Sequence, residues 1–203
     1  MWSQLTTLAC RARRAATDVV SLVRAGEIDD VPADRLGDTC PVTATPRLRP
    51  IAAADIPTVL ALNERDVDLL APLDASRLAE LLAWAERADV IDVEGRVAGF
   101  VITFEAGTDY DSPNYQWFTK RFGDDFSYLD RIVISSDFRR RGLGRFVYEK
   151  LEALAQPLGR MALEVNVEPP NEGSLAFHAA RGYVEVGRLG EPGHVVSLMV
   201  KEL

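Results

Sequence analysis

The residues best suited to chemistry lie in one short run, RRRGLGR, which spans residues 139–145. Four arginines and two glycines are unexpected there, because the chain has a formal net charge of -8. Gly142 and Gly144 carry no side chain, so a ligand can approach the backbone closely. An apolar helical pattern follows, and the first N–H groups of a helix attract anions, as guanidinium groups do. The run therefore predicts a site for a phosphorylated ligand.

The spacing of the two glycines excludes the two commonest phosphate-binding loops. A Rossmann fingerprint would place its third glycine where this chain has Val147. A P-loop would place Lys and then Ser or Thr directly after its second glycine, where this chain has Arg145 and Phe146. The loop must therefore be another kind of phosphate site, or a basic helix start without a ligand.

The elements around this run alternate between strands and helices. An apolar, β-branched strand is expected over 126–135, a helix over 142–155, a strand over 160–167, and a helix over 171–182 that starts at Asn171 and stops at Gly182. The flanking patterns predict strands over 47–51, 183–189 and 194–203, helices over 54–66 and 74–88, and a hairpin over 90–104. This order indicates an α/β domain with a mixed sheet.

The chain divides near residue 46 into an extension and a domain. Residues 1–26 show the spacing of an amphipathic helix, and residues 27–46 are acidic and contain proline, as in a linker. We therefore expect an N-terminal extension over 1–46 and a catalytic domain over 47–203. The extension could bind a partner or a membrane surface, pack loosely on the domain, or reflect a start codon placed too early.

Composition narrows the class of protein. The 203 residues, 47% of them hydrophobic, suffice for one domain with a proper core. The acidic balance argues against non-specific nucleic-acid binding, and no apolar stretch reaches the ~18 residues of a membrane span. Cys10 and Cys40 lack partners at metal-ligand spacing, which favours free thiols, no metal site and a cytoplasmic location.

Two motifs in the right order identify a family resemblance. Arg139-x-x-Gly142-x-Gly144 resembles the pyrophosphate loop of the GNAT superfamily of N-acetyltransferases. That family also has an Asn-started helix that ends in an aromatic-x-x-x-Gly-aromatic pattern, which here is carried by Asn171, Phe177, His178, Gly182 and Tyr183. The resemblance covers residues 47–203. The segments LNERDVDLLAPLD and YDSPNYQWF also resemble a poorly characterised bacterial branch of that superfamily. It implies a mixed sheet of about six to seven strands flanked by helices.

The resemblance also implies a substrate, acetyl-CoA, and residues that would bind it. The pantetheine arm would pair with the backbone of Ile132, Val133 and Ile134, and an N–H of Val133 or Ile134 would stabilise the oxyanion. The diphosphate would rest on the loop, and Asn171 and Phe177 would lie beside the pantetheine. The loop residues concerned are Arg139, Arg140, Arg141, Gly142, Leu143, Gly144 and Arg145.

The expected reaction is direct attack of an amine on the thioester, which calls for a base and an acid. Strand alternation places Tyr128, Asp130 and Ile132 on one face, so Asp130 is one candidate base, and Glu105 is the other; each could instead be an ordinary surface charge. His178 stands where many relatives carry an acidic tyrosine. It could protonate the departing thiolate, or it could simply pack beside the cleft.

Residues 106–127 are long for a hairpin connection and rich in aromatic side chains. They could form a wall or lid of the amine site, a satellite core or a homodimer contact. The leading hypothesis is an N-acetyltransferase that modifies a small molecule or a peptide. The rival hypothesis is a module that binds acetyl-CoA as a sensor or regulator with little or no turnover.

Overall fold

The computed structural model describes residues 45–67 and 70–203. The helix expected over 1–26, and nearly all of the acidic linker that follows it, lie outside the described residues. The division of the chain at residue 46 therefore stays a prediction. Among the described residues, no helix is both long and apolar enough to cross a lipid bilayer.

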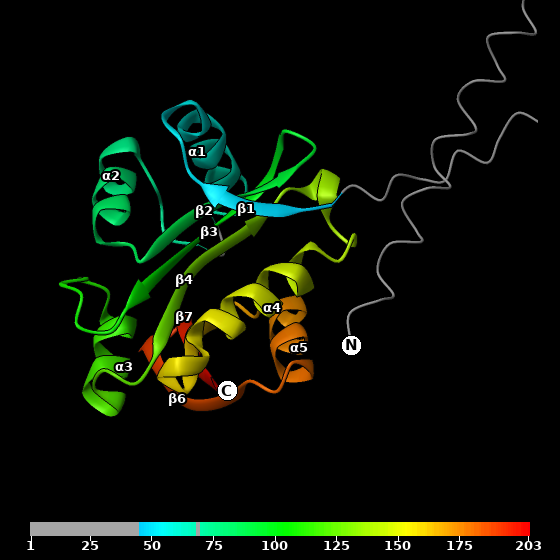
Figure 1. Ribbon diagram of the computed structural model, residues 1–203. Coiled ribbons are helices and arrows are strands. Elements are labelled where there is room, and N and C mark those ends of the chain that lie inside the picture. The colour runs from blue at the N-terminus through cyan, green and yellow to red at the C-terminus, as the bar shows by residue number, and fades with distance from the viewer. Residues whose placement is uncertain (1–44, 68–69) are drawn as a thin grey trace, which may run out of the picture. The chain divides into compact units, whose positions relative to one another are not determined.

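Seven strands form one mixed sheet, which confirms the expected fold class (Figure 1). The strands are β1 (Arg47–Pro50), β2 (Arg87–Val93), β3 (Arg96–Glu105), β4 (Ser127–Ile134), β5 (Arg160–Glu168), β6 (Val184–Glu191) and β7 (His194–Glu202). Their order across the sheet is β1-β2-β3-β4-β5-β7-β6. β4 and β5 pair in parallel, and the other neighbours pair antiparallel.

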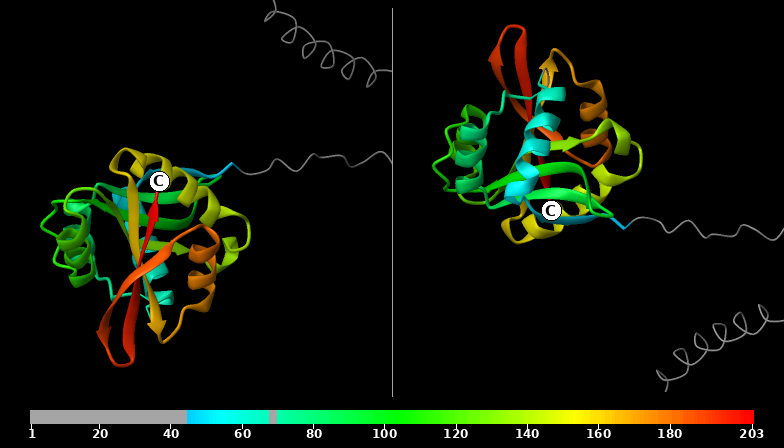
Figure 2. Two further views of the ribbon diagram at one scale, coloured as in Figure 1. Left: turned by 90° about the horizontal axis from the view of Figure 1, so that it is seen from below. Right: turned by 90° about the horizontal axis from the view of Figure 1, so that it is seen from above.

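In the part of the chain that the structure describes, five α-helices cover the two faces of the sheet (Figures 1 and 2). They are α1 (Ile56–Arg65), α2 (Ala75–Trp84), α3 (Pro113–Phe122), α4 (Leu143–Ala155) and α5 (Glu172–Ala180). One apolar core contains buried side chains of α1, α2 and α3, and a second contains those of α4 with partly buried residues of α5. Successive side chains of β3 point to opposite faces of the sheet, so Phe100 and Ile102 pack in the first core and Val101 packs in the second.

β4 and β5 separate soon after they begin. They pair only from Ser127 to Leu129, opposite residues 161–163, although β4 continues to Ile134 and β5 to Glu168. β3 still pairs with β4 up to Ile134, and β7 still pairs with β5. The sheet therefore opens between its two parallel strands. Among the described residues, the edge of β4 that faces this opening has no strand partner beyond Leu129.

The expected alternation along β4 is wrong because the strand contains a bulge. Ile102 of β3 pairs with Arg131, whereas Thr103 pairs with Leu129, so Asp130 is the extra residue. Tyr128 consequently packs into the core under α1, α2 and α3, whereas Ile132 packs against the other core.

The segment 106–127 contains a helix, α3, where the sequence analysis expected a loop. Ser112 caps its first turn by accepting a hydrogen bond from the Tyr115 N–H, Pro113 occupies the first turn, and Gly123 ends it. Tyr115, Phe118 and Phe126 are fully buried in the first core. Most of the aromatic side chains are therefore residues of the first main core rather than of a separate satellite core.

Candidate active site

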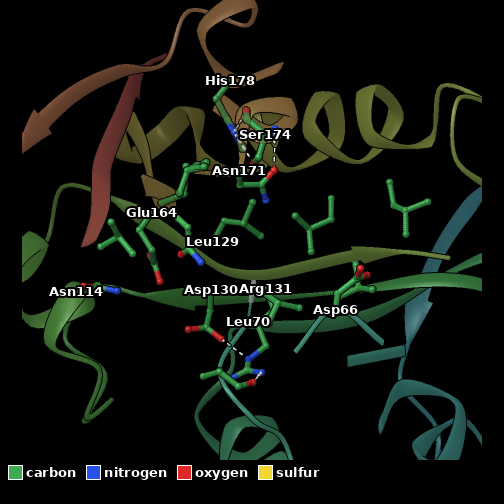
Figure 3. Close-up of a pocket in the computed structure, with 18 of the residues that line it drawn as sticks. Asp66, Leu70, Asn114, Leu129, Asp130, Arg131, Glu164, Asn171, Ser174 and His178 are labelled. Atoms are coloured by element: carbon green, nitrogen blue, oxygen red, sulfur yellow. Dashed lines mark hydrogen bonds and ion pairs between the residues drawn. The ribbon is translucent and has the colours of Figure 1, made fainter. Parts of the chain in front are cut away.

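The opening between β4 and β5 leads into a cavity of about 1070 Å³ (Figure 3). Residues 129–134 and 163–166 of the two separated strands form its middle. The α5 wall comes from α4, α5 and the loop before α4: Arg139, Arg140, Gly144, Tyr148, Asn171, Gly173, Ser174, Phe177 and His178. The α3 wall comes from the opposite face of the sheet: Asp66, Leu70, Ala71, Pro72, Arg77, Tyr110, Asp111, Ser112, Pro113 and Asn114. The cavity thus connects both faces through the split sheet.

The loop before α4 has the backbone of an anion site. Gly142 is the N-cap of α4 with φ 78°, and it supplies no side chain to cap the helix. The first helical hydrogen bond runs from the Phe146 N–H to the Gly142 carbonyl, so the N–H groups of residues 143–145 point out of the helix end. Arg140 also has a positive φ of 63°, which turns successive N–H groups toward one side.

The four arginines of this loop have different surroundings. Arg139 forms an ion pair with Asp66, with an N–O distance of 3.0 Å, and donates to the Ile134 carbonyl. Arg145 pairs with Glu149 on the next turn of α4 at 2.7 Å. The Arg141 guanidinium stacks on the Phe138 ring at 5.2 Å, while Arg140 lines the cavity. Two of the four charges are thus already compensated by carboxylates.

The other predicted binding residues divide between the cavity and its surroundings. Ile132, Val133 and Ile134 lie along the unpaired edge of β4 and line the cavity. Asn171 and Phe177 line it as well, and the Asn171 side chain caps α5 by accepting from the Ser174 N–H. The structure brings these residues together with Arg139, Arg140 and Gly144, whereas Arg141 and Gly142 of the loop, and Leu143 and Arg145 of the first turn of α4, do not line the cavity. The Leu143 side chain is buried in the second core.

Asp130 lies at the bulge with both carboxylate oxygens in use. Oδ1 accepts from the Tyr110 hydroxyl at 2.6 Å, and Oδ2 accepts from Arg131 at 3.0 Å. Arg131 in turn donates to Asn63 and to the Ala71 carbonyl. Burial raises the pKa of Asp130, and the Arg131 guanidinium opposes that shift. This carboxylate is thus held in a structural network at the floor of the α3 wall.

Glu164 of β5 is a carboxylate that the sequence analysis missed. Its side chain points into the cavity across from Asp130 and Asn114 (Figure 3). It accepts a hydrogen bond from the Tyr128 hydroxyl at 2.6 Å and one from Asn114, both neutral donors. Burial and then the nearby Asp130 charge raise the pKa of Glu164 to about 7. The signal was a single Glu within the apolar strand ALEVNV.

Glu105, the other predicted base, lies elsewhere. It ends β3 with an exposed side chain and is not part of the cavity lining. Its backbone carbonyl accepts from the Tyr115 hydroxyl at 2.7 Å, so its position supports α3.

His178 lies in the α5 wall and is 4% exposed. Its Nδ1 lies 2.7 Å from the Ser174 carbonyl oxygen, and its Nε2 lies 2.5 Å from the Tyr148 hydroxyl. Burial lowers the pKa of His178. Both ring nitrogens are thus engaged by neighbouring groups. Among the described residues, no cluster of His, Cys, Asp or Glu is arranged to hold a metal ion.

Comparisons with known proteins place this site in context. The sequence matches the acetyltransferase (GNAT) family over residues 58–183. No curated protein sequence matches the chain.

Solved structures match the fold. Ard1 from Thermoplasma volcanium is 16% identical with a TM-score of 0.60, over 78% of this chain and 97% of that one. The ribosomal-protein-S18-alanine N-acetyltransferase from Escherichia coli is 20% identical with a TM-score of 0.57, over 78% and 94%. A GCN5-related N-acetyltransferase from Kribbella flavida is 16% identical with a TM-score of 0.58, over 78% and 98%.

Proposed function

Because the chain belongs to the GNAT family of acetyltransferases, we propose that it transfers an acetyl group from acetyl-CoA to an amine of a small molecule or a peptide. Family membership makes the chain an acyltransferase, and acetyl-CoA is the acetyl donor that the family uses. The name of the Escherichia coli neighbour, which specifies an alanine of a ribosomal protein, supports an amine as the acceptor.

One observation carries the proposal: the cavity runs from the helix end at Gly144, along the free edge of β4, to the Glu164 carboxylate. The residues present fit acetyl-CoA as a substrate. Nothing lies within 4 Å of the position that a Gly142 Cβ would take, so the loop is open to a diphosphate. Unpaired backbone groups beyond Leu129 can pair with an extended chain such as pantetheine.

Glu164 is the base that this geometry favours. A general base works best when its pKa lies near the operating pH, and the pKa of Glu164 is raised to about 7. The hydrogen-bond donors to Glu164 are neutral, whereas Asp130 forms an ion pair with Arg131. Glu164 would take a proton from the amine, while an N–H on the free edge of β4, at Val133 or Ile134, would stabilise the developing oxyanion.

In this proposal the two walls bind different substrates. The α5 wall and its loop would hold the acetyl donor by backbone groups, and the α3 wall would present the amine to Glu164. Positioning of both reactants across the split sheet supplies much of the rate enhancement. We extend the proposal to a cytoplasmic enzyme without a bound metal, and we keep the homodimer open.

Two measurements on the full chain test the proposal. A thermal titration with acetyl-CoA at about 100 times Kd should stabilise the protein by about 2.7 kcal/mol. Release of free CoA thiol across a panel of small amines and N-terminal peptides should then identify an acceptor. Binding without thiol release from any amine would contradict the proposed transfer.

A further inference from the structure

A chain of polar groups, two of which are buried, runs through the α5 wall. Ser174, His178 and Tyr148 follow one another, and all three line the cavity. Tyr148 comes from α4 and His178 from α5, so the hydrogen bond between them joins the two helices. Tyr148 is only 2% exposed, and a buried hydroxyl of this kind requires a hydrogen-bond partner.

The partners determine where the protons lie. The Ser174 carbonyl oxygen can only accept, so Nδ1 of His178 carries a hydrogen. In the neutral ring Nε2 is then an acceptor, and the Tyr148 hydroxyl donates to it. The tyrosine hydroxyl is therefore the O–H that donates in this chain of groups.

The Tyr148 ring is held from several sides. Its centroid lies 5.1 Å from that of Phe177 and 5.9 Å from that of Tyr183, both nearly edge-on. The Arg181 guanidinium stacks on the Tyr148 ring at 5.3 Å and is itself paired with Glu152 at 2.8 Å. The hydroxyl is thus presented at a fixed place on the cavity wall, as proton transfer requires.

We propose that Tyr148 donates the proton to the departing CoA sulfur and that His178 is a positioning residue that reloads Tyr148. This inference rests on the acetyl transfer proposed above. The resemblance expects an acidic hydroxyl at position 178, and here the hydroxyl reaches that place from α4 instead. His178 then serves through Tyr148 rather than as the acid itself.

The step balances as follows. The carbon–sulfur bond breaks and its electron pair stays on sulfur, which takes the proton of the Tyr148 hydroxyl. Nε2 of the neutral His178 then takes a proton from solvent and passes it to the tyrosine oxygen, so His178 returns to the neutral form with hydrogen on Nδ1. The proton that Glu164 took from the amine returns to solvent.

The test compares Tyr148→Phe with Tyr183→Phe, a neighbouring buried tyrosine outside the cavity lining, whose hydroxyl bonds to Glu152 at 3.3 Å. Tyr148→Phe should lower kcat roughly 100-fold, in the usual range for a general acid, while acetyl-CoA affinity and Tm follow the Tyr183→Phe control. The double variant Tyr148→Phe/His178→Tyr, which returns a hydroxyl to α5, should recover about tenfold of that loss.

Equal kcat values for Tyr148→Phe and Tyr183→Phe would overturn the proposal. So would a loss in Tyr148→Phe that tracks its Tm or its acetyl-CoA affinity and is not relieved by His178→Tyr, because the pair would then be structural. The sulfur departs whatever the acceptor, so the comparison also holds with a hydroxyl acceptor. If only the choice of an amine as acceptor is wrong, this comparison still tests the role of Tyr148.

Discussion

The two walls of the cavity are built by different means. The α5 wall, with its loop, offers backbone: a helix end without a side-chain cap and an unpaired strand edge. The α3 wall adjoins two strand carboxylates, Asp130 of β4 and Glu164 of β5, which are held by tyrosine hydroxyls and a guanidinium, so this side of the cavity offers side chains. Backbone sites tolerate many side chains around them, whereas side-chain networks depend on each member. We therefore expect the two walls to respond to mutation in opposite ways.

The largest expected effect is at Glu164. Replacing it with Gln keeps the shape and removes the base, so kcat should fall roughly 1,000-fold, within the usual range for acid–base catalysis. Acetyl-CoA affinity should stay within about twofold, because Glu164 lies at the far end of the cavity from Gly144. Steady-state kinetics and a binding titration measure both quantities. The carboxylate outside the cavity gives the control, and Glu105→Gln should leave kcat nearly unchanged.

The dependence of kcat/KM on pH gives a second test of the Glu164→Gln variant. A pKa raised to about 7 means that kcat/KM should rise with pH through about 7 in the wild type and lose that limb in Glu164→Gln. Stability should run the opposite way. The folded state holds the proton more tightly than the unfolded chain, so this contribution is present below pH ~4.5 and is lost as pH rises through about 7. A wild-type Tm that rises over this window relative to Glu164→Gln would contradict the assignment.

The next effect tests the backbone wall. Gly142→Val should weaken acetyl-CoA binding about 100-fold, or ~2.7 kcal/mol, because a branched side chain would stand at the helix end and strain a φ of 78°. Gly95→Val is the matched control, since Gly95 has φ 80° and equally open surroundings in the β2–β3 turn. Both variants carry the same backbone strain. Calorimetric titration of both should show the loss in Gly142→Val alone, and equal affinities would remove the loop from the binding site.

The two walls also differ in how far the sequence predicted them. The α5 wall is local: a strand, a glycine-containing turn and a helix follow one another, so periodicity and motif located nearly every element. The mixed sheet, the N-cap at Asn171 and the helix from Leu143 were predicted within a residue or two. Short-range signals are sufficient there because the chemistry resides in the backbone.

The α3 wall depends on contacts that no local pattern encodes. Glu164 reads as an ordinary strand residue until Tyr128 and Asn114, distant in sequence, enclose it. The bulge at Asp130 changes which face each β4 side chain takes, and period-2 reasoning has no signal for it. Helix α3 did carry a signal, which the aromatic content of the segment obscured: Ser112 as N-cap, Pro113 in the first turn and Gly123 after the last.

A smaller effect separates the arginines of the loop. Arg141→Ala should weaken CoA about tenfold, the cost of one charge-assisted hydrogen bond, and weaken dephospho-CoA much less. The Arg141 guanidinium lies over Phe138 with no carboxylate among its described contacts, so its charge can serve the 3′-phosphate. Arg139→Ala should affect both ligands alike, because Asp66 already compensates Arg139. Affinities for the two ligands measure the difference, and a tenfold selectivity loss in Arg139→Ala would reverse the assignment.

The smallest effect concerns the contact that joins the two walls, the ion pair between Arg139 and Asp66. Both side chains are partly exposed, at 55% and 25%, and such a pair contributes about 0.2–1 kcal/mol. Asp66→Asn should therefore change acetyl-CoA affinity by less than about fivefold. The sign should be toward tighter binding, since the freed guanidinium can turn to the diphosphate, and the gain should shrink as salt rises.

The matched control frees the other compensated arginine of the loop without touching the α3 wall. Glu149→Gln releases Arg145, whose ion pair lies wholly on α4. Both variants should then tighten acetyl-CoA to a similar degree, but Asp66→Asn alone should shift the KM for the amine, because Asp66 belongs to the α3 wall. Equal amine KM values in the two variants would mean that the walls act independently and that this ion pair does not couple acetyl-CoA binding to amine binding.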